Sequence, residues 1–254
     1  MSAMAAPRIL GIILARGGSK GVPRKNLRPV LGHPLIAYTI CEARRVRYLS
    51  RLIVSSDDDE IRQAAEAYGA EAPFRRPAEL ANDRATSTAA LIHAVRWAED
   101  AENRRYDYVV ELMTTCPLKT SDDIAAVIDK LVSTGADSVI GVARLDDHHP
   151  ARVKRIVEDR LVDFCVPEPI DARRQDLSPP AYIRNGSIYA MRRDVLIEQG
   201  YRYGTADSRP YVMPAERSVN VDTEVDFLAA EALLARAPRP YVQPLERVRS
   251  EAAR

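Results

Sequence analysis

The sequence predicts an α/β fold in which helices flank a mostly parallel sheet. From residue 9 to about residue 142, short apolar runs typical of buried strands alternate with stretches whose apolar residues recur at helical spacing. The chain of 254 residues is long enough for one large domain of this kind. From 145 to 183 this alternation stops, and short β-like pieces between prolines predict a small β-hairpin insertion.

The expected elements follow in chain order. Strands are expected at 9–14, 52–56, 106–113, 137–142, 184–191 and 211–213. Helices are expected at 34–46, 58–68, 88–102, 121–132, 194–199 and 223–237. Asp57 and Asp58 suit the cap of the second helix, and Asp222 is expected to cap the last one. We therefore expect one domain at 7–237 and a loosely held, polar tail at 238–254.

Composition and charge exclude several classes of protein. The 37 basic and 36 acidic residues nearly cancel, which gives no global case for binding nucleic acid. The apolar runs are far shorter than the ~18 residues of a membrane-spanning helix, and the amino terminus lacks the basic region of a signal peptide. Cys41, Cys116 and Cys165 follow no metal-binding pattern, so we expect a reducing, cytoplasmic location and no metal cluster.

The stretch Leu14-Ala-Arg-Gly-Gly-Ser-Lys-Gly-Val-Pro-Arg-Lys-Asn26 follows the first strand. Its glycines permit a sharp turn, and successive N–H groups in such a turn suit an anion beside several cations. Two of the chain's five lysines, Lys20 and Lys25, fall in this loop. The end of a first strand is where open α/β sheets bind ligands, which favours a polyphosphate such as a nucleotide triphosphate. A solvated surface turn is the alternative, since neither standard glycine-rich phosphate motif is present.

The segment from Ala15 to Asn26 resembles the signature loop of the acylneuraminate cytidylyltransferases, the CMP-sialic acid synthetases. The resemblance covers roughly residues 8–235 and implies a Rossmann-like fold of the nucleotide-diphospho-sugar transferase type. It implies catalytic contacts to the phosphates from Arg16 and Lys25. The nucleotide-binding residues implied in this loop are Ala15, Arg16, Gly17, Gly18, Ser19, Lys25 and Asn26.

Two further segments resemble family motifs that bind substrates. The segment 75–87 resembles the second nucleotide segment, and the implied contacts to cytosine and ribose are Arg76, Ala85 and Ser87. The segment 112–119 resembles the motif L-Q-P-T-S-P-L-R, and the implied contacts to the sugar are Met113, Thr114 and Thr115. Met113 stands where the family has a sugar-binding glutamine and Cys116 where it has a serine, so the acceptor sugar stays open.

The last two resemblances imply a sugar pocket and a metal site. The segment 184–191 resembles a stretch that lines the sugar pocket, which implies substrate binding by Arg184 and Asn185. A guanidinium fork fits the substrate carboxylate, although Arg184 ending a loop is an equal alternative. The segment from 219 to 227 resembles the element that supplies the metal carboxylate, which implies Mg²⁺ binding by Asp222 and Glu224. Helix capping alone is the alternative for these acids.

The resemblance implies an enzyme that transfers CMP from CTP to the 2-hydroxyl of a nonulosonic, sialic-acid-like α-keto acid sugar and releases pyrophosphate. A different acceptor is one alternative: legionaminic or pseudaminic acid, a Kdo-like sugar or a phosphonate. A non-catalytic nucleotide-binding paralogue is another. The resemblance also implies a homodimer formed through the insertion at 145–183. No residue is identified as the base for the hydroxyl proton.

Overall fold

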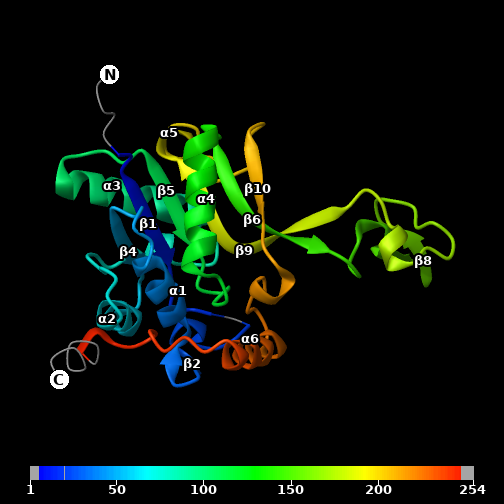
Figure 1. Cartoon of the computed structure of the whole chain (residues 1–254), viewed down its shortest axis with the longest axis horizontal. Coiled ribbons are helices and arrows are strands. Elements are labelled where there is room, and N and C mark those ends of the chain that lie inside the picture. Colours follow the sequence, from blue (N-terminus) through cyan, green and yellow to red (C-terminus); the bar gives the residue numbers. More distant parts are fainter. Residues whose placement is uncertain (1–5, 20, 247–254) are drawn as a thin grey trace.

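The computed structural model of the chain describes residues 6–19 and 21–246 (Figure 1). A six-stranded sheet lies at its centre, with the strand order β10-β6-β9-β5-β1-β4. These strands are β1 Ile9–Leu14, β4 Arg51–Ser55, β5 Tyr108–Leu112, β6 Ser138–Leu145, β9 Ala181–Arg192 and β10 Ser208–Val212. β1 is parallel to β4 and β5, and β6 is parallel to β10, whereas β9 is antiparallel to both of its neighbours. The predicted mostly parallel sheet is confirmed.

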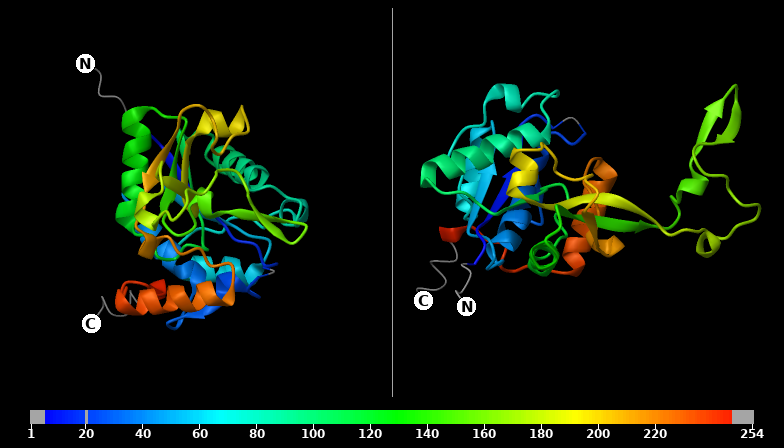
Figure 2. Two further views of the ribbon diagram at one scale, coloured as in Figure 1. Left: turned by 90° about the vertical axis from the view of Figure 1, so that its right-hand side faces the viewer. Right: turned by 90° about the horizontal axis from the view of Figure 1, so that it is seen from above.

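Helices cover both faces of this sheet (Figure 2). The α-helices are α1 Leu35–Arg44, α2 Asp59–Ala67, α3 Ser87–Glu102, α4 Ser121–Thr134, α5 Arg193–Ile197 and α6 Glu224–Arg236. Ile9 and Ile13 of β1 belong to the core that α1, α2, α4 and α6 share, whereas Leu10 and Ile12 belong to the core under α3 and α5. A strand buried on both faces needs apolar residues at every position, which explains the unbroken apolar run of β1.

The helix caps confirm one prediction and overturn another. The Asp58 carboxylate accepts hydrogen bonds from the first-turn N–H groups of α2, as expected. The predicted cap of α6 is wrong, because Thr223 and not Asp222 is its N-cap. The Thr223 hydroxyl accepts from the N–H of Asp226, and the Asp226 carboxylate accepts from the N–H of Thr223. This reciprocal capping box leaves the Asp222 side chain without a capping role.

The insertion extends away from the body of the molecule (Figures 1 and 2). β6 and β9 continue beyond the rest of the sheet and carry a separate hairpin, formed by β7 Lys154–Val157 and β8 Arg160–Asp163. A second small hairpin, β2 Pro29–Val30 with β3 His33–Pro34, follows the first loop. The insertion presents large apolar side chains to solvent, with exposed fractions from 63 % to 94 % at Ile156, Leu161, Phe164 and Ile170.

The tail is held more tightly than the sequence predicts. Arg239 donates hydrogen bonds to the carbonyls of three consecutive residues, 117–119, and forms an ion pair with buried Glu42 at 2.8 Å. Val242 is buried in the main core. The prediction of a loose tail is therefore wrong for 239–242, and 247–254 lie outside the described residues. None of the described helices is both long enough and apolar enough to cross a membrane.

Candidate active site

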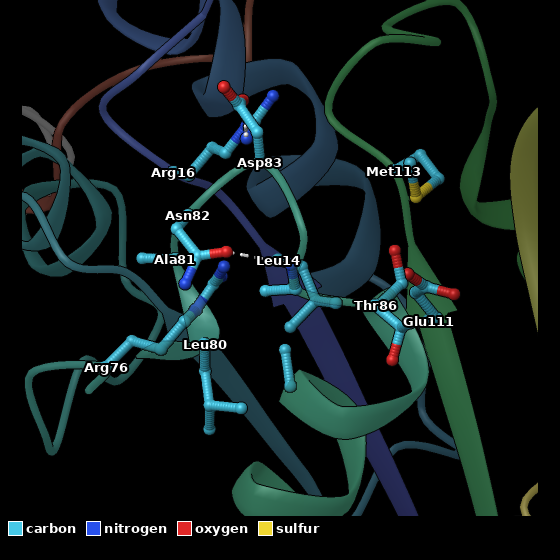
Figure 3. A pocket seen from close by; sticks show the side chains of 13 residues that line it. Leu14, Arg16, Arg76, Leu80, Ala81, Asn82, Asp83, Thr86, Glu111 and Met113 are labelled. Atoms are coloured by element: carbon cyan, nitrogen blue, oxygen red, sulfur yellow. Dashed lines mark hydrogen bonds and ion pairs between the residues drawn. The ribbon is translucent and has the colours of Figure 1, made fainter. Parts of the chain in front are cut away.

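Two adjoining cavities open where β1 and β5 end, the edge at which parallel sheets bind ligands. The Arg76 pocket has a volume of about 300 Å³ (Figure 3) and is lined by Leu14, Arg16, Arg76, Leu80, Ala81, Asn82, Asp83, Ala85, Thr86, Ser87, Ala90, Glu111 and Met113. The Lys25 pocket has a volume of about 260 Å³ and is lined by Leu14, Arg16, Ser19, Gly21, Lys25, Asn26, Met113, Thr114, Thr115 and Asp222. Leu14, Arg16 and Met113 line both, so one ligand can span the two.

Asn26 connects the loop after β1 to the loop after β5. Its amide group donates to the carbonyl of Arg16 at 3.0 Å and accepts from the hydroxyl of Thr114 at 2.6 Å. Ala15 is buried and bonded to the backbone of β4. Gly17 donates its N–H to the Asp57 carboxylate at 3.1 Å, and a β-carbon on Gly17 would meet the Asp58 carboxylate at 2.7 Å. The loop backbone is therefore held in place, and the Gly17 amide is already used.

Lys25 crosses from this loop to the segment that precedes α6. Its ammonium donates to the carbonyl of Val221 at 2.6 Å and to the carboxylate of Asp222 at 2.9 Å. Gly21 packs so closely on this segment that a β-carbon would collide with the carbonyl of Asp222. The Lys25 side chain is only 13 % exposed, whereas that of Asp222 is 62 % exposed. The pocket thus combines the fixed ammonium of Lys25 with the Asp222 carboxylate, which is accessible to a ligand.

Arg16 lies between the two pockets, and its guanidinium forms an ion pair with Asp83 at 2.9 Å. Arg76 is buried and donates to the hydroxyl and carbonyl of Ser55, which fixes its position in the wall. Burial lowers the pKa of Arg76 below the usual value of a guanidinium. Figure 3 shows Arg76 and Asn82 on one side of the pocket and Met113 on the other. Ala85 and Ser87 complete the wall at the start of α3.

A buried lysine supports the segment Met113–Thr115. The Lys119 ammonium is fully buried and donates to the carbonyls of Met113 and Cys116, at 2.6 and 2.5 Å, and to the hydroxyl of Thr39. Burial lowers the pKa of Lys119 to about 8. Arg239 binds the carbonyls of 117–119, so two basic side chains hold the backbone of this turn. The pocket wall that the turn forms is therefore preorganised.

Several predicted site residues lie elsewhere. Glu224 pairs with Arg28 at 2.5 Å and lines neither pocket, so it does not join Asp222. Asn185 is buried and bonded to Ser218, which gives it a structural role. Arg184 is exposed on β9, also outside both pockets, and its guanidinium stacks at 4.2 Å on the ring of Tyr203. Gly18 lines a neighbouring surface hollow.

Glu111 is a pocket residue that the sequence analysis did not identify. It lies in β5, is fully buried, and lines the Arg76 pocket. One of its carboxylate oxygens is bound by Arg202, from the chain segment before β10. Burial raises the pKa of Glu111, and the charge of Arg202 opposes that change. The sequence did carry one signal for this residue, because Glu111 is a charged residue within an otherwise apolar strand.

The chain is similar to known proteins over most of its length. A family model described as Cytidylyltransferase matches residues 10–206 of the chain. The chain belongs to this family. The pseudaminic acid cytidylyltransferase of Campylobacter jejuni is 33 % identical over 224 residues, which are 88 % of this chain and 95 % of that protein. N-acylneuraminate cytidylyltransferase A of Danio rerio is 32 % identical over 234 residues, which are 90 % of this chain and 51 % of that protein.

A solved structure gives the same fold. CMP:2-keto-3-deoxy-manno-octonic acid synthetase in complex with CTP matches this cytidylyltransferase with a TM-score of 0.67 and 22 % identity, over 91 % of this chain and 99 % of that one. The predicted fold and the predicted family are therefore confirmed.

Proposed function

We propose that the chain transfers CMP from CTP to the 2-hydroxyl of a nonulosonic α-keto acid sugar. The observation that carries this proposal is the pair of adjoining cavities joined by Arg16. The Arg76 pocket has the apolar walls and fixed polar groups that suit a nucleoside, and the Lys25 pocket has the cation and carboxylate that suit a triphosphate. The family match supports the reaction class, and relatives named for sialic-type acids support the acceptor class.

The residues present fit one magnesium ion. Mg²⁺ is usually held by one or two carboxylates together with substrate phosphates and water, and the exposed Asp222 carboxylate in the Lys25 pocket meets that need. Glu224 is engaged by Arg28, so we assign the metal to Asp222 alone. When bound, the ion would offset charge on the phosphates. In the described part of the chain, no cluster of three or more potential metal ligands occurs.

The chemistry that we propose for the chain's own residues is mainly positioning. The sugar hydroxyl oxygen bonds to the α-phosphorus, the bond from that phosphorus to the bridging oxygen breaks, and pyrophosphate leaves with its electron pair. In this proposal Arg16 and Lys25, which line the Lys25 pocket, stabilise the negative charge that grows on the phosphates, and Ser19 adds a hydroxyl donor. No histidine lines either pocket within the described residues, so the hydroxyl proton has no assigned base.

The acceptor sugar is proposed only as a class. Relatives named for pseudaminic acid and for N-acylneuraminate are nearly equally identical to this chain, and Met113 replaces the glutamine expected beside the sugar. Thr114 and Thr115 stay proposed sugar contacts, and Arg184 stays a proposed contact for the acceptor carboxylate. The free cysteines support the proposal of a reducing, cytoplasmic location.

Pyrophosphate release tests this function. Four nucleotides are each combined with a panel of acidic sugars that includes sialic, pseudaminic and legionaminic acids and Kdo. We expect turnover with CTP well above turnover with ATP, GTP or UTP, and only with a sialic-type acceptor. Equal turnover with a purine nucleotide would contradict the assignment of the Arg76 pocket. No pyrophosphate with any pair would favour a non-catalytic paralogue.

We also propose that the insertion joins two copies of the chain. Its large apolar side chains, Leu161 and Phe164 among them, are exposed to solvent, and exposed apolar patches commonly mark the surface that binds another protein chain. Sedimentation velocity is expected to give a dimer for the wild type and a monomer after Leu161→Asp with Phe164→Asp. Val225 on α6 is similarly exposed but lies outside the insertion, so Val225→Asp is the matched control. A monomeric wild type at micromolar concentration would contradict the proposal.

A further inference from the structure

Glu111 has a buried carboxylate oxygen without a partner. Its side chain is 0 % exposed, and Arg202 reaches only Oε2, with its Nε at 2.9 Å and its second nitrogen closer still. Oε1 has no hydrogen-bond partner in the structure. A buried acceptor left unsatisfied costs free energy, more so when it carries charge. An oxygen of this kind therefore points to a donor that arrives with a ligand.

The Arg76 pocket is the place from which such a donor can arrive. Glu111 lines this pocket, on the side of Met113 in Figure 3 and across from Arg76 and Asn82. Arg76 is engaged by Ser55, and the Asn82 side-chain oxygen already accepts two backbone N–H groups of its own loop. The Thr86 hydroxyl accepts from the first turn of α3. These neighbouring groups are used within the protein, whereas Glu111 Oε1 is not.

The carboxylate is also held in one orientation. Arg202 stacks on the rings of Tyr189 and Tyr203, at 4.7 and 5.6 Å from their centres, and Arg184 also stacks on Tyr203, at 4.2 Å from its centre. Tyr189 is itself buried in β9, the strand beside β5. A guanidinium fixed by two rings fixes the carboxylate that it binds. Oε1 is thus a preorganised acceptor.

We propose that Glu111 is a specificity-determining residue, whose Oε1 accepts a hydrogen bond from an N–H or O–H group of the bound substrate. The inference rests on the proposed function, since that function supplies the candidate donors. These donors are the exocyclic amine of cytosine, the ribose 2′-hydroxyl, and a hydroxyl or amide N–H of the acceptor sugar. A carboxylate is a suitable acceptor for the cytosine amine, and it repels the carbonyl oxygen that uracil presents at the same position.

Glu111→Gln reverses the hydrogen-bonding character of the atom at the unpaired position. Arg202 donates, so the amide oxygen of glutamine takes the place of Oε2, and the amide N–H₂ takes the place of Oε1. A donor of the substrate then meets another donor. We expect the affected preference to change by about tenfold to a hundredfold, the range for one well-placed hydrogen-bond pair.

Three comparisons of steady-state kinetics identify the donor. If it is the cytosine amine, the ratio of kcat/KM for CTP over UTP falls, because uracil offers an acceptor to the new N–H₂. If it is the ribose, the ratio for CTP over 2′-deoxy-CTP falls toward one. If it is the acceptor sugar, KM for the sugar rises while KM for CTP stays constant. Any one of these results supports the proposal.

Glu99→Gln is the matched control. Glu99 is also nearly buried and bound by an arginine, Arg193, at 2.9 Å, but it lines neither pocket of the candidate site. The Glu99→Gln variant therefore measures how the loss of a buried charge affects the fold, without a change in the candidate site. If Glu111→Gln changes none of the three quantities beyond this control, the proposal is overturned. A wild type without turnover would instead overturn the proposed function, so the two failures are distinguishable.

A double variant covers the case in which Glu111→Gln does not fold. Apolar side chains of similar size often replace a buried ion pair without loss of stability, so Glu111→Leu with Arg202→Met is expected to fold. The methionine keeps contact with Tyr189 and Tyr203. This variant has neither acceptor nor donor at the position, so at least one of the three quantities is again expected to change by about tenfold. Wild-type values for all three would overturn the proposal.

Discussion

Replacing Asp222 by asparagine separates the proposed metal role of the carboxylate from its structural contacts. Asparagine keeps an oxygen that accepts from Lys25 and loses only the hydrogen bond that the other, exposed carboxylate oxygen accepts from the Asn220 amide. The Asp222 carboxylate is 62 % exposed, so loss of its ion pair with Lys25 costs at most about 1 kcal/mol. Because Thr223 caps α6, the substitution removes no helix cap. We expect the melting temperature to fall by no more than about 2–4 °C, the shift that 1 kcal/mol produces in a domain of this size.

The enzyme activity of Asp222→Asn is expected to fall far more than its stability. A neutral amide is a poor ligand for Mg²⁺, and we expect turnover to drop by on the order of a hundredfold at physiological Mg²⁺. High Mg²⁺ or Mn²⁺ should restore part of it. Pyrophosphate release across a metal titration, beside melting curves, measures both effects. Thr223→Ala is the control, expected to cost about 1 kcal/mol and to keep the metal dependence. An asparagine variant with wild-type turnover and metal dependence would refute this reasoning.

Three further predictions follow from the contacts of single side chains. Lys25→Ala is expected to lower kcat/KM by about a hundredfold. Arg16→Lys should also lower it, because the point charge of lysine does not replace the planar guanidinium fork. Near-normal kinetics of both variants would show that the loop has only a structural role. Arg239→Ala leaves buried Glu42 without its cation and should cost about 3–5 kcal/mol in urea unfolding, and a cost below about 1 kcal/mol would contradict an anchored tail. The pKa of Lys119 is about 8 in the folded protein against 10.5 ordinarily, so between these values the unfolded chain binds more protons. From pH 8 to pH 10, the free energy of unfolding of the wild type should therefore rise by on the order of 1–3 kcal/mol relative to that of Lys119→Met. An unchanged difference between the two proteins would disprove the lowered pKa of Lys119.

The order of the elements was predictable because most of them are encoded locally. The apolar run of β1 and the acidic cap of α2 need no distant information. β9 is different, because the predicted strand at 184–191 is shorter than the observed Ala181–Arg192 and its antiparallel direction was not predicted. A parallel return needs a crossover, usually a helix, and the insertion at 145–183 contains no helical pattern. That missing helix was the signal for the direction of β9.

The candidate site was predictable only where one segment carries the chemistry. The loop from Ala15 to Asn26 can be recognised from its glycines and basic residues. The residues that contact its side chains, however, lie far along the chain. Asp222 and Thr223 are both good capping residues, and Asp226 decides between them by completing the capping box of Thr223. Glu111 depends on Arg202, which is 91 positions later, so no local pattern shows that half of its carboxylate stays unpaired.

The contacts of Lys25 also determine when the site is complete during synthesis. Its ammonium donates to Val221 and Asp222, which are 196 and 197 positions later in the chain. Amino-terminal segments leave the ribosome first and begin to fold, and contacts between distant residues form slowly. A nascent chain that ends before Val221 already contains the strands from β1 to β10, yet Lys25 has neither of its acceptors. The loop that is translated first therefore gains its last contacts nearly at the end of synthesis. A nascent chain stalled just before Val221 would contain every strand of the sheet but not the complete site.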